Sequence, residues 1–227
     1  MSILYRASGP VTLVGGGPVE DGMLAEALAL APEAVGADGG GDVILPGGYR
    51  FAAVIGDLDS IRDADRLRAA GVPVHRIPEQ DTTDFEKCLR SVAASLYLCV
   101  GFAGGRMDHH LAAMSALVRH PERPAVLIGP EDVAFLAPRT LAFDAVPGMR
   151  VSLYPMAPAT GTLSRGLRWS VEGLTLAPDR RIGTSNIAEG ERVAVAFDRR
   201  SVIAVLPRET LPQVAELLTR TAETGEM

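Results

Sequence analysis

The chain has few of the features that mark a nucleic-acid-binding, disulfide-linked or membrane-spanning protein. Its 22 Lys and Arg are outnumbered by 28 Asp and Glu, giving a net charge of −6. Because binding to a phosphate backbone needs clustered basic residues, we expect no nucleic-acid partner. The two cysteines, Cys88 and Cys99, lack metal-ligand spacing and lie in apolar stretches. This favours reduced core thiols over a disulfide or a reactive thiol.

Long apolar runs are also missing. No stretch approaches the length of a membrane span, and the N-terminal segment is too short and too polar for a signal sequence. We therefore expect a cytoplasmic protein with no membrane partner. What remains is a 227-residue chain that is 47% hydrophobic, with a mean hydropathy of +0.17. This composition is typical of a compact folded protein, long enough for one large domain or two small ones.

The first two-thirds of the chain alternates short apolar runs with amphipathic stretches. Continuous apolar strands that alternate with helices predict an α/β fold with a parallel sheet covered on both faces. The expected strands lie at 11–17, 34–40, 51–60, 73–78, 96–105 and 124–129, and the expected helices at 21–34, 63–71, 81–95 and 107–120.

The pattern changes near residues 144–150. Short β-like segments follow, at 150–157, 161–171, 191–197 and 201–207, and the last stretch, 209–227, reads as a helix. Such segments indicate a small antiparallel β-sandwich. We therefore expect an α/β domain over residues 1–147 and a β-sandwich domain with a C-terminal helix over 148–227.

Aspartates follow the predicted strands or open the helices after them. Because ligands bind beyond the carboxyl ends of parallel strands, these side chains are expected at one edge of the sheet. Carboxylates gathered there would raise one another's pKa unless a cation lay among them. Mg²⁺ prefers such oxygen ligands, and a D-x-D pair at a strand end together with a D-x-x-D pair on a helical turn suits one ion or two. The six aspartates are Asp38, Asp57, Asp59, Asp81, Asp84 and Asp108.

Each of these acids also has a purely structural interpretation. Asp81 could cap a helix with Asp84 as its partner three residues later, Asp108 could complement a helix dipole, and Asp38 could serve a turn. It is the number of acids at one edge that favours the metal.

Glycine-rich turns follow three of the strands, at 15–17, 38–41 and 104–106. Glycine lets backbone N–H groups approach an anion, although tight strand-to-helix turns are the alternative explanation. Arg106 favours phosphate, which guanidinium binds through paired hydrogen bonds. There is no Walker A motif, and Glu20 stands where a dinucleotide fingerprint needs its third glycine. Acids, glycine turns and a guanidinium together predict a nucleoside triphosphate bound through Mg²⁺.

The "DHH" tripeptide at 108–110 allows a competing hypothesis, a manganese-dependent phosphoesterase. Such a two-metal site needs further histidines, and only His75 and His120 remain in the chain. His109 and His110 are better explained as packing groups or as neighbours of the metal ligands.

The motifs "ADGG", "VIGDLDSI", "PEQDTTDFEKCL" and "GFAGGRMDHHLA", followed by "GLRWSV" and "TSN", stand in the order and approximate spacing of thiamine pyrophosphokinases. The chain resembles that family over roughly residues 13 to 190. The resemblance implies an N-terminal α/β domain, a C-terminal β-sandwich and a homodimer with active sites between subunits. It also implies the transfer of a diphosphoryl group from ATP to the hydroxyl of thiamine, which gives thiamine diphosphate and AMP.

Residue roles follow from the same resemblance. The metal would be held by Asp57, Asp59 and Asp84. Nucleotide and phosphate contacts would come from Asp38, Gln80, Asp81, Lys87, Gly104 and Gly105. Arg106 and Asp108 would complete the catalytic set, and either Asp84 or Asp108 could accept the hydroxyl proton. Trp169 would stack on thiamine from the partner subunit, with Ser185 and Asn186 as polar contacts.

The residues expected to bind thiamine also have purely structural interpretations. Trp169 could be a half-buried sandwich residue, and "TSN" at 184–186 could be a plain turn. A non-catalytic thiamine or nucleotide sensor on the same scaffold is a third hypothesis. Such a protein would be expected to have lost some of the acids.

Overall fold

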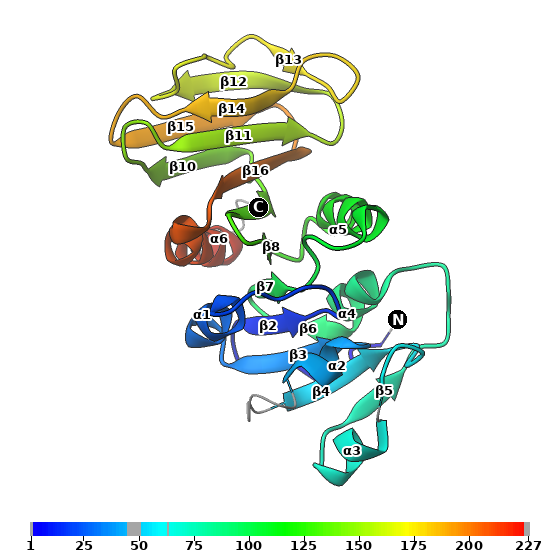
Figure 1. Ribbon diagram of the computed structural model, residues 1–227. Helices are drawn as coiled ribbons and strands as arrows, with labels where there is room; N and C mark the ends of the chain where they lie inside the picture. The colour runs from blue at the N-terminus through cyan, green and yellow to red at the C-terminus, as the bar shows by residue number, and fades with distance from the viewer. Residues whose placement is uncertain (1, 45–50, 63, 225–227) are drawn as a thin grey trace. The chain divides into compact units, whose positions relative to one another are not determined.

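The computed structural model describes residues 2–44, 51–62 and 64–224, which form two compact units (Figure 1). The first contains the residues up to Ala116 together with Ala125–Pro130, and the second contains Leu117–Pro124 and the chain from Glu131 onward. The division thus comes earlier than the boundary predicted between residues 147 and 148. Strands β9 (Asp132–Leu136) and β10 (Thr140–Asp144) pair with C-terminal strands, so this segment lies in the second unit.

The first unit is built on six strands, and every neighbouring pair among them is parallel. In spatial order these are β8 (Ala125–Ile128), β7 (Tyr97–Val100), β2 (Val11–Val14), β3 (Glu33–Ala37), β4 (Phe51–Gly56) and β5 (Val74–Arg76). All residues of β2, β7 and β8 are buried. Strands buried at every position have both faces covered, so the α/β prediction is confirmed.

Helices connect these strands, in the order α1 (Met23–Leu30), α2 (Gly40–Ile44), α3 (Ala64–Ala69), α4 (Asp84–Ser91) and α5 (Met107–Arg119). Helix α1 is shorter than predicted because Pro32 disfavours a helical conformation at Ala31, the residue that ends it. Helix α2 was not predicted, since its two glycines have low helix propensity. The N-terminal strand β1 (Tyr5–Arg6) pairs with β6 (Val92–Ala93), directly after α4.

Helix α4 begins three residues later than predicted. Its N-cap is Thr83, whose side-chain oxygen accepts a hydrogen bond from the amide of Glu86 at 3.3 Å. Asp81 is therefore not the helix cap, and Asp84 is the first helical residue instead of a capping partner.

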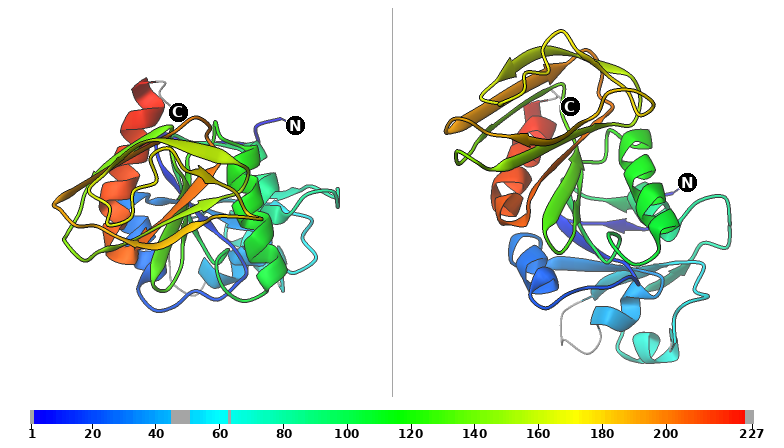
Figure 2. Two further views of the ribbon diagram at one scale, coloured as in Figure 1. Left: turned by 90° about the horizontal axis from the view of Figure 1, so that it is seen from above. Right: turned by 45° about the horizontal axis from the view of Figure 1, so that its top comes forward.

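The second unit contains two sets of four antiparallel strands. One set is ordered β14 (Gly183–Ile187), β11 (Arg150–Pro155), β16 (Val202–Pro207) and β9, and the other β10, β15 (Arg192–Phe197), β12 (Ala159–Arg165) and β13 (Thr175–Leu176). Along β15, Val193, Val195 and Phe197 are buried in alternation with less buried residues, as expected for a strand with one face on a core. Figure 2 gives two further views of these strands.

The described part of the chain ends in a short 3₁₀ turn, η2 (Arg208–Thr210), and helix α6 (Leu211–Thr224), which is red in Figure 1. Helix α6 buries an apolar face formed by Leu211, Val214, Leu217 and Leu218. Within the described parts of the chain, no helix is both long enough and apolar enough to cross a membrane.

Candidate functional site

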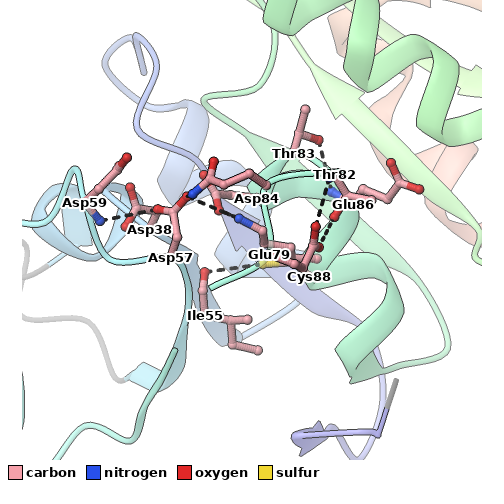
Figure 3. A network of polar contacts seen from close by, with 12 residues as sticks. Asp38, Ile55, Asp57, Asp59, Glu79, Thr82, Thr83, Asp84, Glu86 and Cys88 are labelled. Carbon is pink, nitrogen blue, oxygen red and sulfur yellow. Dashed lines mark hydrogen bonds and ion pairs between the residues drawn. The ribbon is translucent and has the colours of Figure 1, made fainter. Parts of the chain in front are cut away.

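Three of the predicted aspartates come together at the carboxyl ends of β3 and β4. Asp38 follows β3 and Asp57 and Asp59 follow β4, and carboxylate oxygens of all three lie within 4.8 Å of one another. Figure 3 shows these side chains together, with Asp84 next to them. Gly56 permits this close approach, because a Cβ there would lie only 2.8 Å from the Cβ of Asp38. We call Asp38, Asp57 and Asp59 the acid cluster.

The acid cluster depends on unusual backbone conformations. Asp38 has φ of 46° and Leu58 has φ of 69°. A positive φ is uncommon for a non-glycine residue and is strained for one as bulky as leucine. Asp57 and Asp59 lie beyond the end of β4 at Gly56, and they therefore converge through a turn at Leu58 and not through strand alternation. Ser185 is the third non-glycine residue with positive φ in the described chain, so all three lie in the motifs identified from the sequence.

Asp38 is the most buried member of the acid cluster, with 3% of its surface exposed. Its Oδ2 accepts a hydrogen bond from the amide of Ser60 at 3.1 Å, whereas its buried Oδ1 has no hydrogen-bond partner among the described residues. Burial raises the pKa of Asp38, and the nearby charges of Asp84 and Asp57 add to this effect. A buried, unpartnered carboxylate oxygen that lies near other carboxylates fits a cation ligand.

Asp57 joins the acid cluster to helix α4. Its Oδ2 accepts hydrogen bonds from Gln80 Nε2 at 2.8 Å and from Lys87 Nζ at 3.3 Å. The Lys87 ammonium also contacts Asp84 Oδ1 at 3.1 Å. Partial burial alone would raise the pKa of Asp57, but the hydrogen bonds from Gln80 and the Asp59 amide and the charge of Lys87 lower it overall. Asp84 is thus linked to Asp57 of the acid cluster through the ammonium of Lys87, which pairs with both.

Asp81 has a different environment. Its side chain is exposed, and its backbone amide donates to Glu79 Oε2 at 2.8 Å. Glu79 also accepts hydrogen bonds from the amide and the hydroxyl of Thr82, and the Thr82 hydroxyl is the main reason why the pKa of Glu79 is lowered. Glu79 therefore orders the loop that carries Gln80. We did not predict this role, since an isolated glutamate in a polar loop gives no sequence signal.

The glycine turn before α5 carries the predicted guanidinium. Gly104 and Gly105 have φ of 84° and 68°, so the turn needs residues without a Cβ. Arg106 donates to Asp108 through Nε at 3.1 Å and Nη2 at 2.6 Å, and both side chains are exposed. Hydrogen bonding and charge from Arg106 lower the pKa of Asp108. Asp108 lies outside the acid cluster.

Histidines do not contribute to the acid cluster within the described residues. His110 Nδ1 accepts a hydrogen bond from the amide of Gly104 at 3.3 Å, which makes it a support for the glycine turn. His109 is exposed. This arrangement does not favour the phosphoesterase hypothesis, which needs histidine among the metal ligands.

The predicted thiamine residues lie in the second unit. Trp169 is 56% exposed, so about half of its surface is accessible to a ligand. The buried Asn186 side chain fixes the backbone of Trp169. Asn186 Oδ1 accepts a hydrogen bond from the Trp169 amide at 3.1 Å, and Asn186 Nδ2 donates one to the Trp169 carbonyl at 2.7 Å. Ser185 is exposed and its amide donates to Ser152 Oγ at 3.0 Å. The guanidinium of Arg168 lies 5.7 Å from the centroid of the Trp169 ring.

The site and the fold define a class of protein: an α/β unit with an acid cluster beyond its strands, followed by an antiparallel β unit that presents a tryptophan. Two models of one known protein family match this chain. Residues 24–128 match the model of the thiamin pyrophosphokinase catalytic domain, and residues 140–202 match that of the thiamin pyrophosphokinase vitamin B1 binding domain. The chain belongs to the thiamin pyrophosphokinase family, and the predicted resemblance is confirmed.

Individual relatives agree with this assignment. The chain is 30% identical over 168 residues to thiamine pyrophosphokinase 1 of Oryza sativa subsp. japonica, a match that covers 66% of this chain and 64% of the rice protein. The match thus spans less than two thirds of that relative. Thiamin pyrophosphokinases from Candida albicans and yeast share the fold, with TM-scores of 0.74 and 0.75 and identities of 16% and 17%. They cover 89% and 90% of this chain, and 92% of each solved chain is matched.

Asp38→Asn is expected to stabilise the metal-free protein by about 1–2 kcal/mol. The substitution removes a buried charge, and an amide in place of the unpartnered oxygen could donate to Asp57 or Asp59. Chemical denaturation in EDTA measures the difference. Stabilisation by added Mg²⁺ should be reduced in the variant. Asp65→Asn, at an exposed position on α3, is the control; an Asp38→Asn protein that is less stable in EDTA would contradict the prediction.

Proposed function

We propose that the protein transfers a diphosphoryl group from ATP to the hydroxyl of thiamine and so forms thiamine diphosphate and AMP. The observation that carries the proposal is the match of both family models, in order, to the two parts of the chain. The first match contains the acid cluster and the second contains Trp169. Family membership implies ATP as the phosphoryl donor.

We propose Mg²⁺ as the metal. Asp57 and Asp59 are its predicted ligands, and the orphaned oxygen of Asp38 supports that residue as a third one. When bound, Mg²⁺ would neutralise phosphate charge, which is the main requirement of phosphoryl-type transfer. Asp84 was also predicted as a ligand, and its contact with Lys87 keeps it close to the acid cluster.

We propose Asp84, which Lys87 links to the acid cluster, as the acceptor of the hydroxyl proton in place of Asp108, which lies outside that cluster. Asp108 is held by two hydrogen bonds from Arg106, which lower its pKa and weaken it as a base. Arg106 is exposed and its pKa is raised by Asp108, so it stays a cation that could bind phosphate. We propose that Gly104 and Gly105 let the backbone of this turn approach the phosphates, and that Gln80 and Asp81 line the same region from the loop before α4.

We propose that Trp169 stacks on thiamine. The thiazolium ring is cationic, and an exposed indole attracts a cation through its π face. Arg168 already lies over this indole, so thiamine would use the opposite face or displace the guanidinium. Asn186 would act by holding the backbone of Trp169, and Ser185 would offer its exposed hydroxyl.

We also propose a cytoplasmic homodimer whose active sites are completed by the partner subunit. Large apolar side chains that are exposed in a single chain, such as Met107, Leu111 and Trp169, support an interface. Neither nucleic acid nor a membrane is a proposed partner.

Incubation with thiamine, ATP and Mg²⁺ is expected to yield AMP and thiamine diphosphate in equal amounts. Chromatography of the nucleotides is the test, and ADP as the sole nucleotide product would exclude diphosphoryl transfer. Phosphate release with Mn²⁺ in the absence of thiamine would support the phosphoesterase hypothesis instead. Binding of both substrates without turnover would support the sensor.

A further inference from the structure

Lys87 is a buried cation held between two acids. Its side chain is 1% exposed, although lysine is almost never fully buried without a partner. Its ammonium lies 3.3 Å from Asp57 Oδ2 and 3.1 Å from Asp84 Oδ1. These two carboxylates engage two of the three N–H donors of the ammonium, so the phosphate contact that the family resemblance implies would have only the third. The two ion pairs point instead to a role of Lys87 toward the acids themselves.

The contacts of Lys87 determine how Asp57 is oriented. Asp57 Oδ2 accepts hydrogen bonds from both Lys87 and Gln80. Within the described residues, Asp57 Oδ1 accepts a long hydrogen bond of 3.3 Å from the amide of Asp59. Oδ2 is thus engaged by protein donors, which leaves Oδ1 for a cation. Lys87 also joins the end of β4, which carries Asp57, to the first residue of α4, Asp84. The one positive charge of Lys87 therefore forms ion pairs with both Asp57 and Asp84.

We infer that Lys87 is a positioning residue, the resident counter-ion that orients Asp57 and Asp84 and limits the affinity of the acid cluster for divalent metal. The inference rests on the proposed Mg²⁺ site and concerns Lys87 in place of the predicted phosphate contact. It has two consequences with opposite signs. Without Lys87 the site gains a net negative charge, which strengthens metal binding, but it loses the orientation of its carboxylates, which slows turnover.

The electrostatic consequence should dominate metal binding. A cation held by Asp57 would lie within a few ångströms of the Lys87 ammonium, because both contact the same carboxylate. Repulsion between a unit charge and a divalent charge at such a distance, in a partly buried site, exceeds the contribution of one orienting hydrogen bond. Removal of the ammonium is therefore expected to tighten Mg²⁺ binding by about tenfold or more.

Lys87→Met tests this, because methionine keeps much of the side-chain volume without the charge. Calorimetric titration with Mg²⁺ alone, without nucleotide or thiamine, should show the tighter binding. With both substrates, kcat should fall about tenfold or more while KM for ATP changes less than about threefold. Unchanged or weaker Mg²⁺ binding would overturn the inference. A raised KM for ATP with kcat preserved would also overturn it, in favour of a phosphate contact.

Two controls separate this role from a merely structural one. Lys87→Arg keeps the charge and should retain wild-type Mg²⁺ affinity. Arg68→Met removes a basic residue from an exposed pair with Asp65 that has the same i, i+3 spacing on α3, and should leave Mg²⁺ affinity unchanged. If Lys87→Met does not fold, Lys87→Gln replaces it, with circular dichroism as the check.

Failure of the proposed function would be recognisable separately. Wild-type protein that binds Mg²⁺ but forms no thiamine diphosphate would refute the proposed reaction. The Mg²⁺ titrations of the variants would still decide the role of Lys87.

Discussion

Asp57→Asn is expected to lower the rate of thiamine diphosphate formation by about a thousandfold or more. Asp57 contacts more of the candidate site residues than its neighbours do, because it belongs to the acid cluster and also accepts hydrogen bonds from Gln80 and Lys87. An amide is a weak ligand for Mg²⁺ compared with a carboxylate. It also cannot neutralise the Lys87 ammonium, which then keeps its ion pair with Asp84.

The Asp57→Asn protein should remain folded, at a cost of about 1–3 kcal/mol for the weakened ion pair with Lys87. Coupled measurement of AMP release gives the rate, and thermal unfolding followed by circular dichroism gives the stability. Asp65→Asn removes a carboxylate from an exposed pair on α3 and should keep full activity. Turnover within tenfold of the wild type would show that Asp57 does not hold the metal.

The α/β part of the fold could be predicted because its signals are local. Buried strands such as β7 and β8 are continuous apolar runs, and the glycines and helices of this unit follow at short intervals. Strands β9 and β10 could not be assigned to the second unit in the same way. Their partners, β16 and β15, lie far along the chain, and pairing at such separation leaves no local pattern.

The acid cluster could be predicted in part, for a related reason. Neighbouring parallel strands bring their carboxyl ends to one edge, and this placed Asp38 near Asp57. The turn at Leu58 and the orphaned oxygen of Asp38 depend on backbone angles that a sequence pattern does not specify. Lys87 was predicted as a phosphate contact, but its burial between Asp57 and Asp84 was not predicted, because a lysine three residues after an aspartate normally indicates a solvated helix face. Lys87 is buried because α4 packs against the sheet, and this packing is a tertiary contact that the local sequence does not reveal.

Subunit complementation is the second large effect that we expect. If Trp169 serves the active site of the partner subunit, a heterodimer of Asp57→Asn and Trp169→Ala chains has one site with both substitutions and one with neither. Each homodimer lacks an essential group at both of its sites. Isolated through two different affinity tags, the heterodimer should therefore recover about half of the wild-type activity per dimer.

The assay should use thiamine well below saturation, because Trp169→Ala alone is expected to raise KM for thiamine by about tenfold or more through loss of the exposed indole. Light scattering first establishes that the wild-type protein is a dimer. A control heterodimer of Asp57→Asn and Asp65→Asn chains should have half of the wild-type activity, whether Trp169 serves its own chain or the partner subunit. It therefore checks that heterodimers have been isolated. Activity of the mixed heterodimer no higher than that of the two parent homodimers would place each acid cluster and its tryptophan within one chain. The dimer, if formed, would then serve a purpose other than completing the active site.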